Sequence, residues 1–493
     1  MDEKKAKAAR ANRGTRGNKK GVKARKIAVE ILTRIDVSGA YANLALDHAL
    51  DKSDMEARDR AFTTALVLGV LRQREAIDQE LRALASQPLE KIRPPVLNLL
   101  RVAIFQLNEM SDIPESAVLD TAGDIARLVG HEGIVKFVTG ILRAYLRNPH
   151  KAGKADLERE EENSLKLARQ YSMPHWLVVR WLNAYGESET LSLLKHCQVA
   201  PALTLRVNSL AIETEAMAAI LLKKGIKTRV SELVPTCLIV ESKGKDRPKL
   251  EDFPGFAEGI FTVQDEAAAF VSQVVQAAPG ETIIDLCAAP GGKTMNMAEH
   301  MEGKGRIIAV DIHDSRLKLL RETRLRLGLR NIETRQADGR FFKFEGGADR
   351  VLVDAPCSGT GVIAKRSDLR LNRLESDLEK LTRLQTALLN NAAKLVRPGG
   401  LLVYSTCSIE KEEGPQIVAQ FLAEHSDFQL EDLSDAFPPD LVDKWNLAEE
   451  AHSGQVMFLP SRQAPQGFYI ARLRKSADLP ETLHEQEPGG DII

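Results

Sequence analysis

Strands and helices alternate over the second half of the chain, and this alternation restricts the fold more than any other feature of the sequence. Short apolar segments rich in Ile, Val and Leu recur there, and charged segments with helical spacing, such as SRLKLLRETRLRLG, separate most of them. This order is typical of a parallel sheet that helices cover on both faces. The predicted strands are ETIIDL (281–286), RIIAVD (306–311), NIETRQ (331–336), DRVLVD (349–354), GLLVYS (400–405) and a final edge strand in GFYIARLRK (467–475).

The first half of the chain has a different pattern and predicts further domains. The 493 residues are too many for one ordinary core. Residues 23–148 read as successive helices, the charged run KAGKADLEREEEN reads as a linker, and residues 201–255 mix strands with a helix. The predicted parts are a basic tail at 1–21, an all-α bundle at 22–150, a small helical and α+β connector at 164–255, an α/β domain at 256–475 and a flexible tail at 476–493.

The charge of the chain is distributed unevenly. The net charge is −1, yet residues 1–26 hold eleven Lys and Arg against two acidic residues, Asp2 and Glu3. Such a stretch is expected to be disordered, and it can act as an electrostatic arm on a phosphate backbone or only as a solubilising tail.

The cysteines indicate a reducing compartment. The five cysteines form no CxxC pair, so neither a zinc ribbon nor a disulfide framework is predicted. The sequence also has no signal-peptide pattern and no 18-residue apolar run. We therefore expect a cytoplasmic protein that binds neither membrane nor metal.

A glycine-containing loop follows the first predicted strand. In DLCAAPGGKT (285–294), Gly291 and Gly292 let the backbone approach a ligand closely. Asp311 ends the second strand, where a carboxylate can accept hydrogen bonds from a ribose, and Asp338 follows the third strand. This segment matches neither the GxGxxG motif of dinucleotide-binding proteins nor the P-loop motif. The pattern predicts an adenosine-containing cofactor, with a nicotinamide-binding oxidoreductase as an alternative.

Two cysteines follow the fourth and fifth predicted strands. Cys357 lies in VLVDAPCSGTG and Cys407 in LLVYSTCS, at the sheet edge where the cofactor is expected. A thiolate that adds to carbon 6 of cytosine makes carbon 5 nucleophilic toward an electrophilic methyl group, and a base must then remove the carbon-5 proton. A thiol needs nearby positive charge, or a helix N-terminus, to ionise at neutral pH. Asp354 can assist at ring nitrogen 3, or it can be a strand-end cap or a cofactor contact.

Basic residues follow Cys357 and recur on the predicted helix at 315–328. Next to a base-modifying site they can hold RNA phosphates, although such residues on a helix are often only a solvated face. They are Lys365, Arg366, Arg370, Arg373, Lys380 and Arg383, and Arg316, Lys318, Arg321, Arg324 and Arg326.

The motifs DLCAAPGGKT, VDIH, ADGR, DAPCSGTG and YSTCS, in this order and spacing, resemble those of the RNA 5-methylcytosine methyltransferases. The helical N-terminal region resembles the RNA-binding fold of the antitermination protein NusB. Together they resemble the Sun/Fmu group of that family, the bacterial ribosomal RNA small subunit methyltransferases B, over about residues 22–475. The resemblance implies a Rossmann-like, S-adenosylmethionine-dependent methyltransferase domain whose last strand is antiparallel. It also implies a cytosine of 16S ribosomal RNA, flipped out of its stack, as substrate, and we expect a monomer.

The same resemblance implies roles for individual residues. Asp311 holds the ribose of the cofactor, Asp338 lies by the adenine, and Asp354 lies near the methionine part and the target base. Cys407 is the nucleophile, and Cys357 assists release of the product. The residues implied to line S-adenosylmethionine are Cys287, Ala288, Ala289, Pro290, Gly291, Gly292 and Lys293.

The chain departs from the family pattern at four positions, and the sequence leaves alternative functions open. Arg366, Ser367, Gly414 and Gln466 stand where we expect His, Pro, Asn and an acidic residue, which leaves the shape of the RNA-facing rim in doubt. In a DNA cytosine methyltransferase, Cys357 would attack instead. The sequence is also compatible with a methyltransferase for a different ribosomal or transfer RNA cytosine and with a non-catalytic RNA-binding assembly factor.

Overall fold

The computed structural model describes residues 21–149, 162–241, 250–462 and 466–477, which group into two compact units. We call them the helical unit and the sheet unit. The helical unit contains the described residues up to 202, with 241–253 and 362–377; the sheet unit contains the others. The predicted connector is divided between them, with 203–240 in the sheet unit. The predicted domain boundaries stay a prediction, and most of the predicted tails and linker lies outside the described residues.

The helical unit is built from amphipathic helices. In the first of them, over residues 21–38, Ala24, Ala28, Ile31 and Ile35 are buried on one face. The helices that follow are α2 (Ala42–Asp51), α3 (Ala57–Arg72), α4 (Arg74–Leu84), η1 (Leu89–Lys91), α5 (Pro94–Glu109), α6 (Glu115–Val129), α7 (Glu132–Arg147), α9 (Asn163–Gln170), α10 (His175–His196), η3 (Leu250–Asp252) and α15 (Leu369–Asn372).

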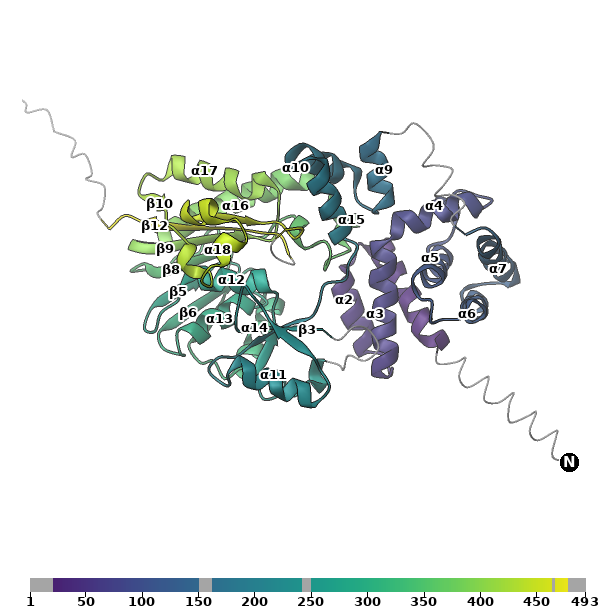
Figure 1. The fold of residues 1–493 in the computed structure, drawn as a ribbon, viewed down its shortest axis with the longest axis horizontal. Coiled ribbons are helices and arrows are strands. Elements are labelled where there is room, and N and C mark those ends of the chain that lie inside the picture. Colours follow the sequence, from purple (N-terminus) through teal and green to yellow (C-terminus); the bar gives the residue numbers. More distant parts are fainter. Residues whose placement is uncertain (1–20, 150–161, 242–249, 463–465, 478–493) are drawn as a thin grey trace, which may run out of the picture. The chain divides into compact units, whose positions relative to one another are not determined.

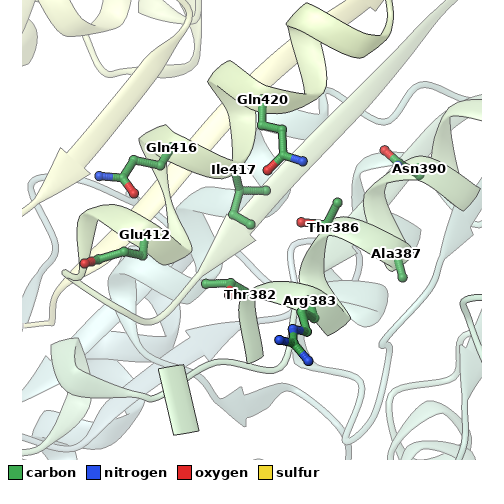
Figure 2. Close-up of a pocket in the computed structure, with 9 residues that line it drawn as sticks. All are labelled: Thr382, Arg383, Thr386, Ala387, Asn390, Glu412, Gln416, Ile417 and Gln420. Atoms are coloured by element: carbon green, nitrogen blue, oxygen red, sulfur yellow. The ribbon is translucent and has the colours of Figure 1, made fainter. Parts of the chain in front are cut away.

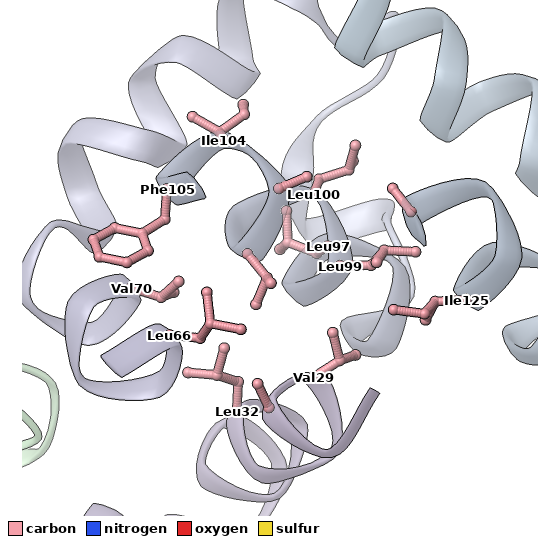
Figure 3. Packing of buried hydrophobic residues seen from close by; sticks show 14 of the residues in the cluster. Val29, Leu32, Leu66, Val70, Leu97, Leu99, Leu100, Ile104, Phe105 and Ile125 are labelled. Atoms are coloured by element: carbon pink, nitrogen blue, oxygen red, sulfur yellow. The ribbon is translucent and has the colours of Figure 1, made fainter. Parts of the chain in front are cut away.

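Helix α5 lies at the centre of this unit. Prolines at its first two positions fit a helix start, where no N–H partner is needed. Its side chains Leu100 and Ile104 are fully buried and pack in the core formed with the first helix, α3 and α6 (Figure 3). Arg101 is also buried on α5 and forms two 2.7 Å hydrogen bonds to the carboxylate of Asp78 and one of 3.0 Å to Asp36.

The sheet unit is centred on a mixed sheet. Its described strands run in the order β10-β12-β9-β8-β5-β6-β7, with β11 paired to β12. Strands β5 to β9 are parallel, and β12 is antiparallel to β9, which confirms the predicted direction of the last strand. The strands are β5 (Thr282–Asp285), β6 (Arg306–Asp311), β7 (Ile332–Gln336), β8 (Ala348–Asp354), β9 (Val396–Thr406), β10 (Phe428–Leu430), β11 (Gln455–Phe458) and β12 (Phe468–Lys475).

Helices cover both faces of this sheet. Helices α16 and α17 pack on one face, and α12, α13 and α14 on the other (Figure 1). The chain passes from β5 outward to β7 and then returns to β8 beside β5, so a topological switch point lies at the carboxyl ends of β5 and β8. The helices are α12 (Glu266–Val275), α13 (Gly292–His300), α14 (Asp314–Arg326), η4 (Thr360–Val362), α16 (Ser376–Leu395), η5 (Lys411–Glu413), α17 (Pro415–Glu424), η6 (Ser434–Ala436), α18 (Leu441–Lys444) and α19 (Ala448–His452).

A second, antiparallel sheet belongs to the same unit. Its order is β2-β3-β1-β4, and α11 (Thr214–Lys223) precedes β2. Arg206 on β1 is fully buried and binds Glu299 and Asn296 of α13, which attaches the small sheet to the helix after the cofactor loop. Its strands are β1 (Thr204–Val207), β2 (Thr228–Val230), β3 (Cys237–Val240) and β4 (Phe261–Val263).

Candidate active site

Main-chain hydrogen bonds attach the glycine-containing loop after β5 to the two neighbouring strands. The N–H of Leu286 donates to the carbonyl of Leu352 on β8 (3.0 Å), and that of Ala288 to the carbonyl of Val310 on β6 (2.9 Å). The loop ends at Gly291, whose φ of 105° is strained for any residue with a side chain. These bonds hold the loop at the switch point.

Carboxylates at the ends of β6 and β7 flank this loop. Asp311 is buried, and its two oxygens accept the N–H groups of Ala289 (3.2 Å) and His313 (2.9 Å). Asp338 follows β7 and is half-buried. Hydrogen bonds from the Arg340 side chain hold the pKa of Asp338 below its usual range. Two hydrogen-bonded carboxylates therefore lie at adjacent strand ends.

Asp354, at the end of β8, connects the loop to the fifth parallel strand. Its Oδ2 accepts from Lys293 Nζ (2.7 Å), and its Oδ1 accepts from Ser405 Oγ on β9 (2.9 Å). Burial alone would lower the pKa of Lys293, but the carboxylate of Asp354 raises it, so the lysine stays charged. The ammonium group is thus fixed beside the strand that leads to Cys407.

The two predicted cysteines meet at this edge of the sheet. Cys357 Sγ lies 3.2 Å from Cys407 Sγ. The hydrogen bond from Cys357, together with the charge of Lys293, lowers the pKa of Cys407 against the effect of burial. The same hydrogen bond and burial raise the pKa of Cys357 well above its usual value. The arrangement favours a thiolate on Cys407 and a thiol on Cys357.

The other cysteines have different surroundings. Cys197 and Cys237 are buried in the cores, where burial raises the pKa of Cys197 to about 11 and that of Cys237 to about 12. Cys287 lies in the glycine-containing loop, and burial raises its pKa well above the usual value. All five cysteines are among the described residues, and all are free. Only Cys407 has a lowered pKa among them.

Asp285, the last residue of β5, belongs to the site, although the sequence pattern predicts only its place at a strand end and no role for it. It is buried, and its Oδ2 accepts from Thr294 Oγ1 (2.8 Å) at the start of α13. Burial raises its pKa to about 7. The motif DLCAAPGGKT contains both residues, but the pattern does not show that the strand end and the helix start face each other.

One predicted RNA contact, Arg370, serves the fold instead, and another, Arg316, is bonded to the cofactor loop. Arg370 is buried and donates to the carbonyls of Arg72 (2.7 Å), Tyr171 (3.2 Å) and Cys197, at the C-terminal ends of three helices of the helical unit. Arg316 donates to the carbonyl of Ala289 (2.6 Å). The prediction of a phosphate contact is wrong for Arg370, because its guanidinium is enclosed by main-chain acceptors.

Other basic residues of α14 are also engaged. Arg321 binds Asp314, Arg324 donates to the carbonyl of Ile332, and Arg326 donates to the carbonyls of Phe256 and Phe261. Of the four departures from the family pattern, Ser367 and Gln466 are buried, and a side chain on Gly414 would meet the ring of Tyr469 at 2.8 Å.

A groove of about 550 Å³ lies between α16 and α17. Its walls carry polar side chains, with Thr382, Arg383 and Thr386 on one side and Gln416 and Gln420 on the other (Figure 2). None of the predicted catalytic or cofactor-binding residues lines it, whereas Arg383 is one of the predicted phosphate contacts.

The described residues contain no group of three or more His, Cys, Asp or Glu side chains that could hold a metal ion. Within the same ranges, no helix has both the length and the apolar character that crossing a bilayer requires.

Comparison with known proteins identifies the family. The family model described as 16S rRNA methyltransferase RsmB/F matches residues 272–474, the NusB family model matches 22–147, and a ferredoxin-like domain of RsmF/B-like methyltransferases matches 173–245. A protein of Synechocystis named "Probable ribosomal RNA small subunit methyltransferase B" is 36% identical over 92% of this chain and 100% of its own length. The chain belongs to the ribosomal RNA small subunit methyltransferase B family.

Further matches agree with this assignment. Ribosomal RNA small subunit methyltransferase B of Pectobacterium atrosepticum is 31% identical, over 92% of this chain and 98% of its own. The crystal structure of the protein PH0851 has a TM-score of 0.76 and 28% identity, over 92% of this chain and 99% of that one. The predicted family and fold class are confirmed: a NusB-like helical domain and a Rossmann-like methyltransferase domain. The roles of the site residues stay predictions.

Proposed function

We propose that this protein transfers a methyl group from S-adenosylmethionine to carbon 5 of a cytosine in 16S ribosomal RNA, through a covalent bond between Cys407 Sγ and carbon 6. One observation carries the proposal: the thiols of Cys357 and Cys407 lie 3.2 Å apart, beside a lysine and a carboxylate that connect them to the glycine-containing loop. Neither a nicotinamide reaction nor a purely structural role needs this pair.

The residues at the strand ends fit the proposed cofactor. S-adenosylmethionine, when bound, supplies an electrophilic methyl group. Asp311 and Asp338 supply carboxylate acceptors for ribose hydroxyls and an adenine amine, and Asp354 supplies one for an ammonium group. The buried Oδ1 of Asp285 has no hydrogen-bond partner among the described residues. The loop residues assigned to this role are Cys287, Ala288, Ala289, Pro290, Gly291, Gly292 and Lys293.

The two thiols divide the reaction between them. The thiolate of Cys407 forms a bond to carbon 6, which makes carbon 5 nucleophilic, and Asp354 assists at ring nitrogen 3. Bonding of Cys407 to carbon 6 removes the thiolate that raises the pKa of Cys357, so the Cys357 thiol can lose its proton to solvent. After methylation, the resulting Cys357 thiolate accepts the carbon-5 proton. The electron pair of the C–H bond re-forms the ring double bond, and the Cys407–carbon 6 bond breaks with its electron pair returning to sulfur. The lowered pKa of Cys407 suits attack and departure.

Domain composition supports the choice of RNA. The match to the NusB family over residues 22–147 supports an RNA-binding role for the helical domain, and the curated relatives are named for ribosomal RNA of the small subunit. We propose 16S RNA, free or in early small-subunit particles, as the partner of a monomeric cytoplasmic enzyme. A different ribosomal or transfer RNA cytosine and a non-catalytic assembly role are the alternatives.

A trapping experiment tests the chemistry. With 5-fluorocytosine-containing 16S RNA, which has no carbon-5 proton to lose, the wild-type protein is expected to form a stable covalent adduct. Cys407→Ala should form no adduct, whereas Cys357→Ala should still form it. Loss of the adduct in Cys357→Ala but not in Cys407→Ala would show the DNA-methyltransferase assignment of roles instead. Bisulfite sequencing of ribosomal RNA from cells with and without the gene then identifies the cytosine, and an unchanged pattern contradicts the substrate.

A further inference from the structure

A buried hydrogen-bonded network joins the two cysteine loops from behind. It contains the carboxylate of Glu413 and the hydroxyls of Ser358, Ser408 and Thr360, all of them buried. Ser358 donates to Glu413 through its N–H (2.9 Å) and its hydroxyl. Ser358 Oγ lies 3.1 Å from Ser408 Oγ, which lies 3.1 Å from Thr360 Oγ1. Ser358 follows Cys357 and Ser408 follows Cys407, so the network connects the residues next to the two thiols.

The direction of the hydrogen bonds follows from the chemistry of the groups. The Ser358 hydroxyl donates its single proton to the Glu413 carboxyl group, so its oxygen accepts from Ser408. Thr360 Oγ1 accepts the N–H of Ile409 (3.1 Å), which leaves its own proton for Ser408. The hydroxyl protons therefore all point along one line that ends on Glu413. Bonds aligned in this way toward a charged acceptor strengthen one another.

Glu413 also contacts the residues that precede each cysteine. Gln385 on α16 donates through one amide nitrogen to both Glu413 (2.9 Å) and the carbonyl of Pro356 (2.9 Å), and Pro356 precedes Cys357. The carbonyl of Glu413 accepts from Thr406 Oγ1 (3.4 Å), which precedes Cys407. One residue is thus bonded, directly or through one partner, to the neighbours on both sides of both cysteines.

We propose that Glu413 is a positioning residue that sets the separation of the Cys357 and Cys407 thiols. This inference rests on the proposed function, in which the two thiols cooperate. A buried carboxylate is unfavourable unless several donors satisfy it, and a hydrophobic residue would fill the same space without that penalty. Glu413 is bonded to the two loops that carry the only thiol pair of the described residues. The hydrogen bond between those thiols depends on how the two loops are held.

The test compares three variants with the wild-type protein in forming the adduct with 5-fluorocytosine RNA. Glu413→Ala removes the acceptor, and Ser358→Ala removes the hydroxyl while leaving the carboxylate in place. Both are expected to slow adduct formation at neutral pH by about 10- to 100-fold, because small displacements of reacting groups have effects of this size. The carboxylate of Glu413 itself raises the pKa of Cys407, so the pH profile is interpreted in Ser358→Ala, which keeps that carboxylate. In Ser358→Ala the rising limb should move to higher pH, since Cys407 loses its donor. Glu413→Gln keeps the size and shape of the side chain. Its amide group can donate to the Ser358 hydroxyl oxygen if the hydroxyl hydrogen bonds reverse direction, so this variant should recover part of the rate.

The matched control is Glu412→Ala, because Glu412 lines the outer groove of Figure 2 and not the network. It should keep the wild-type rate and pH profile. A wild-type pH limb in Ser358→Ala, or wild-type rates of adduct formation in both variants, would overturn the inference. So would a lower melting temperature that alone accounts for the loss of rate. Ser358→Ala keeps the test valid if Glu413→Ala fails to fold. If the wild-type protein forms no adduct, the proposed function is contradicted. If the wild-type protein forms the adduct and the variants form it at the same rate, only the role of Glu413 is contradicted.

Discussion

Each unit of this protein buries a set of opposite charges, and the two sets differ in what surrounds them. In the helical unit, Arg101 faces Asp78 and Asp36, and the side chains of Arg101 and Asp78 are 4% and 8% exposed. In the sheet unit, Lys293 faces Asp354, and their side chains are 12% and 30% exposed. The first set is enclosed by helices, whereas the second lies at strand ends that a ligand can approach. Enclosed charges hold a fold together, and charges at an open edge can act on a reactant.

The geometry of the two pairs supports this distinction. Arg101 is bidentate to Asp78, with both bonds at 2.7 Å, and such a fork satisfies both partners. Lys293 makes one 2.7 Å bond and also lowers the pKa of a neighbouring thiol. Breaking the first pair should therefore affect stability, and breaking the second should affect chemistry.

The largest effect is expected from Arg101→Met, which leaves Asp78 buried without its partner. Loss of one member of a buried ion pair lowers the free energy of unfolding by about 3–5 kcal/mol. Urea unfolding of the full chain measures it. The control is Arg127→Met, whose partner Asp124 is exposed on the same helix, and its effect should stay below about 0.5 kcal/mol. Equal effects of the two substitutions would contradict the role assigned to the buried pair.

Lys293→Met should produce the next largest effect, and it should appear in the reaction. Removing a preorganised charge from an active site lowers the rate by about 10²- to 10³-fold. Without the ammonium group, the pKa of Cys407 rises and less thiolate is present at neutral pH. The rising limb of the kcat/KM profile should then move to higher pH.

Methyl transfer to 16S RNA, measured at several pH values, checks the Lys293 prediction, with thermal unfolding alongside. Lys304→Met is the control, because Lys304 pairs with Glu302 on the exposed surface. An unchanged pH limb in Lys293→Met, or a loss of activity that follows unfolding, would remove the distinction between the two charge pairs.

The open edge of the sheet is also the part of the molecule that the sequence predicts best. Parallel strands end at one edge of a sheet, so the positions of Asp311, Asp354, Cys357 and Cys407 in the strand pattern are enough to predict that they lie together. That these side chains share one edge follows from the parallel direction of the strands, whereas which strands are neighbours is known only from the structure.

Residues bonded across elements cannot be found in this way. Glu413 meets Gln385, 28 positions away on another element, and Arg370 reaches carbonyls 173 to 298 positions away. Nothing in the local pattern distinguishes these residues from an exposed acidic or basic side chain. The sequence pattern therefore assigns Arg370 to RNA, although its surroundings are three helix ends.

The smallest effect is expected from Gly291→Ala, which tests whether the open edge needs its backbone as well as its charges. At Gly291 φ is 105°, and a Cβ would lie 2.6 Å from the side chain of Leu320, so strain and crowding act together. We expect a loss of about 1–3 kcal/mol in unfolding free energy and weaker binding of S-adenosylhomocysteine in calorimetry. Gly303→Ala separates the two causes, because its φ is also positive, at 69°, but no atom lies within 4 Å of the added carbon. It should lower stability by about 1 kcal/mol and leave ligand affinity unchanged. If both variants bind the ligand equally well, the loop tolerates displacement, and the charges of Lys293 and Asp354 alone define this edge of the sheet.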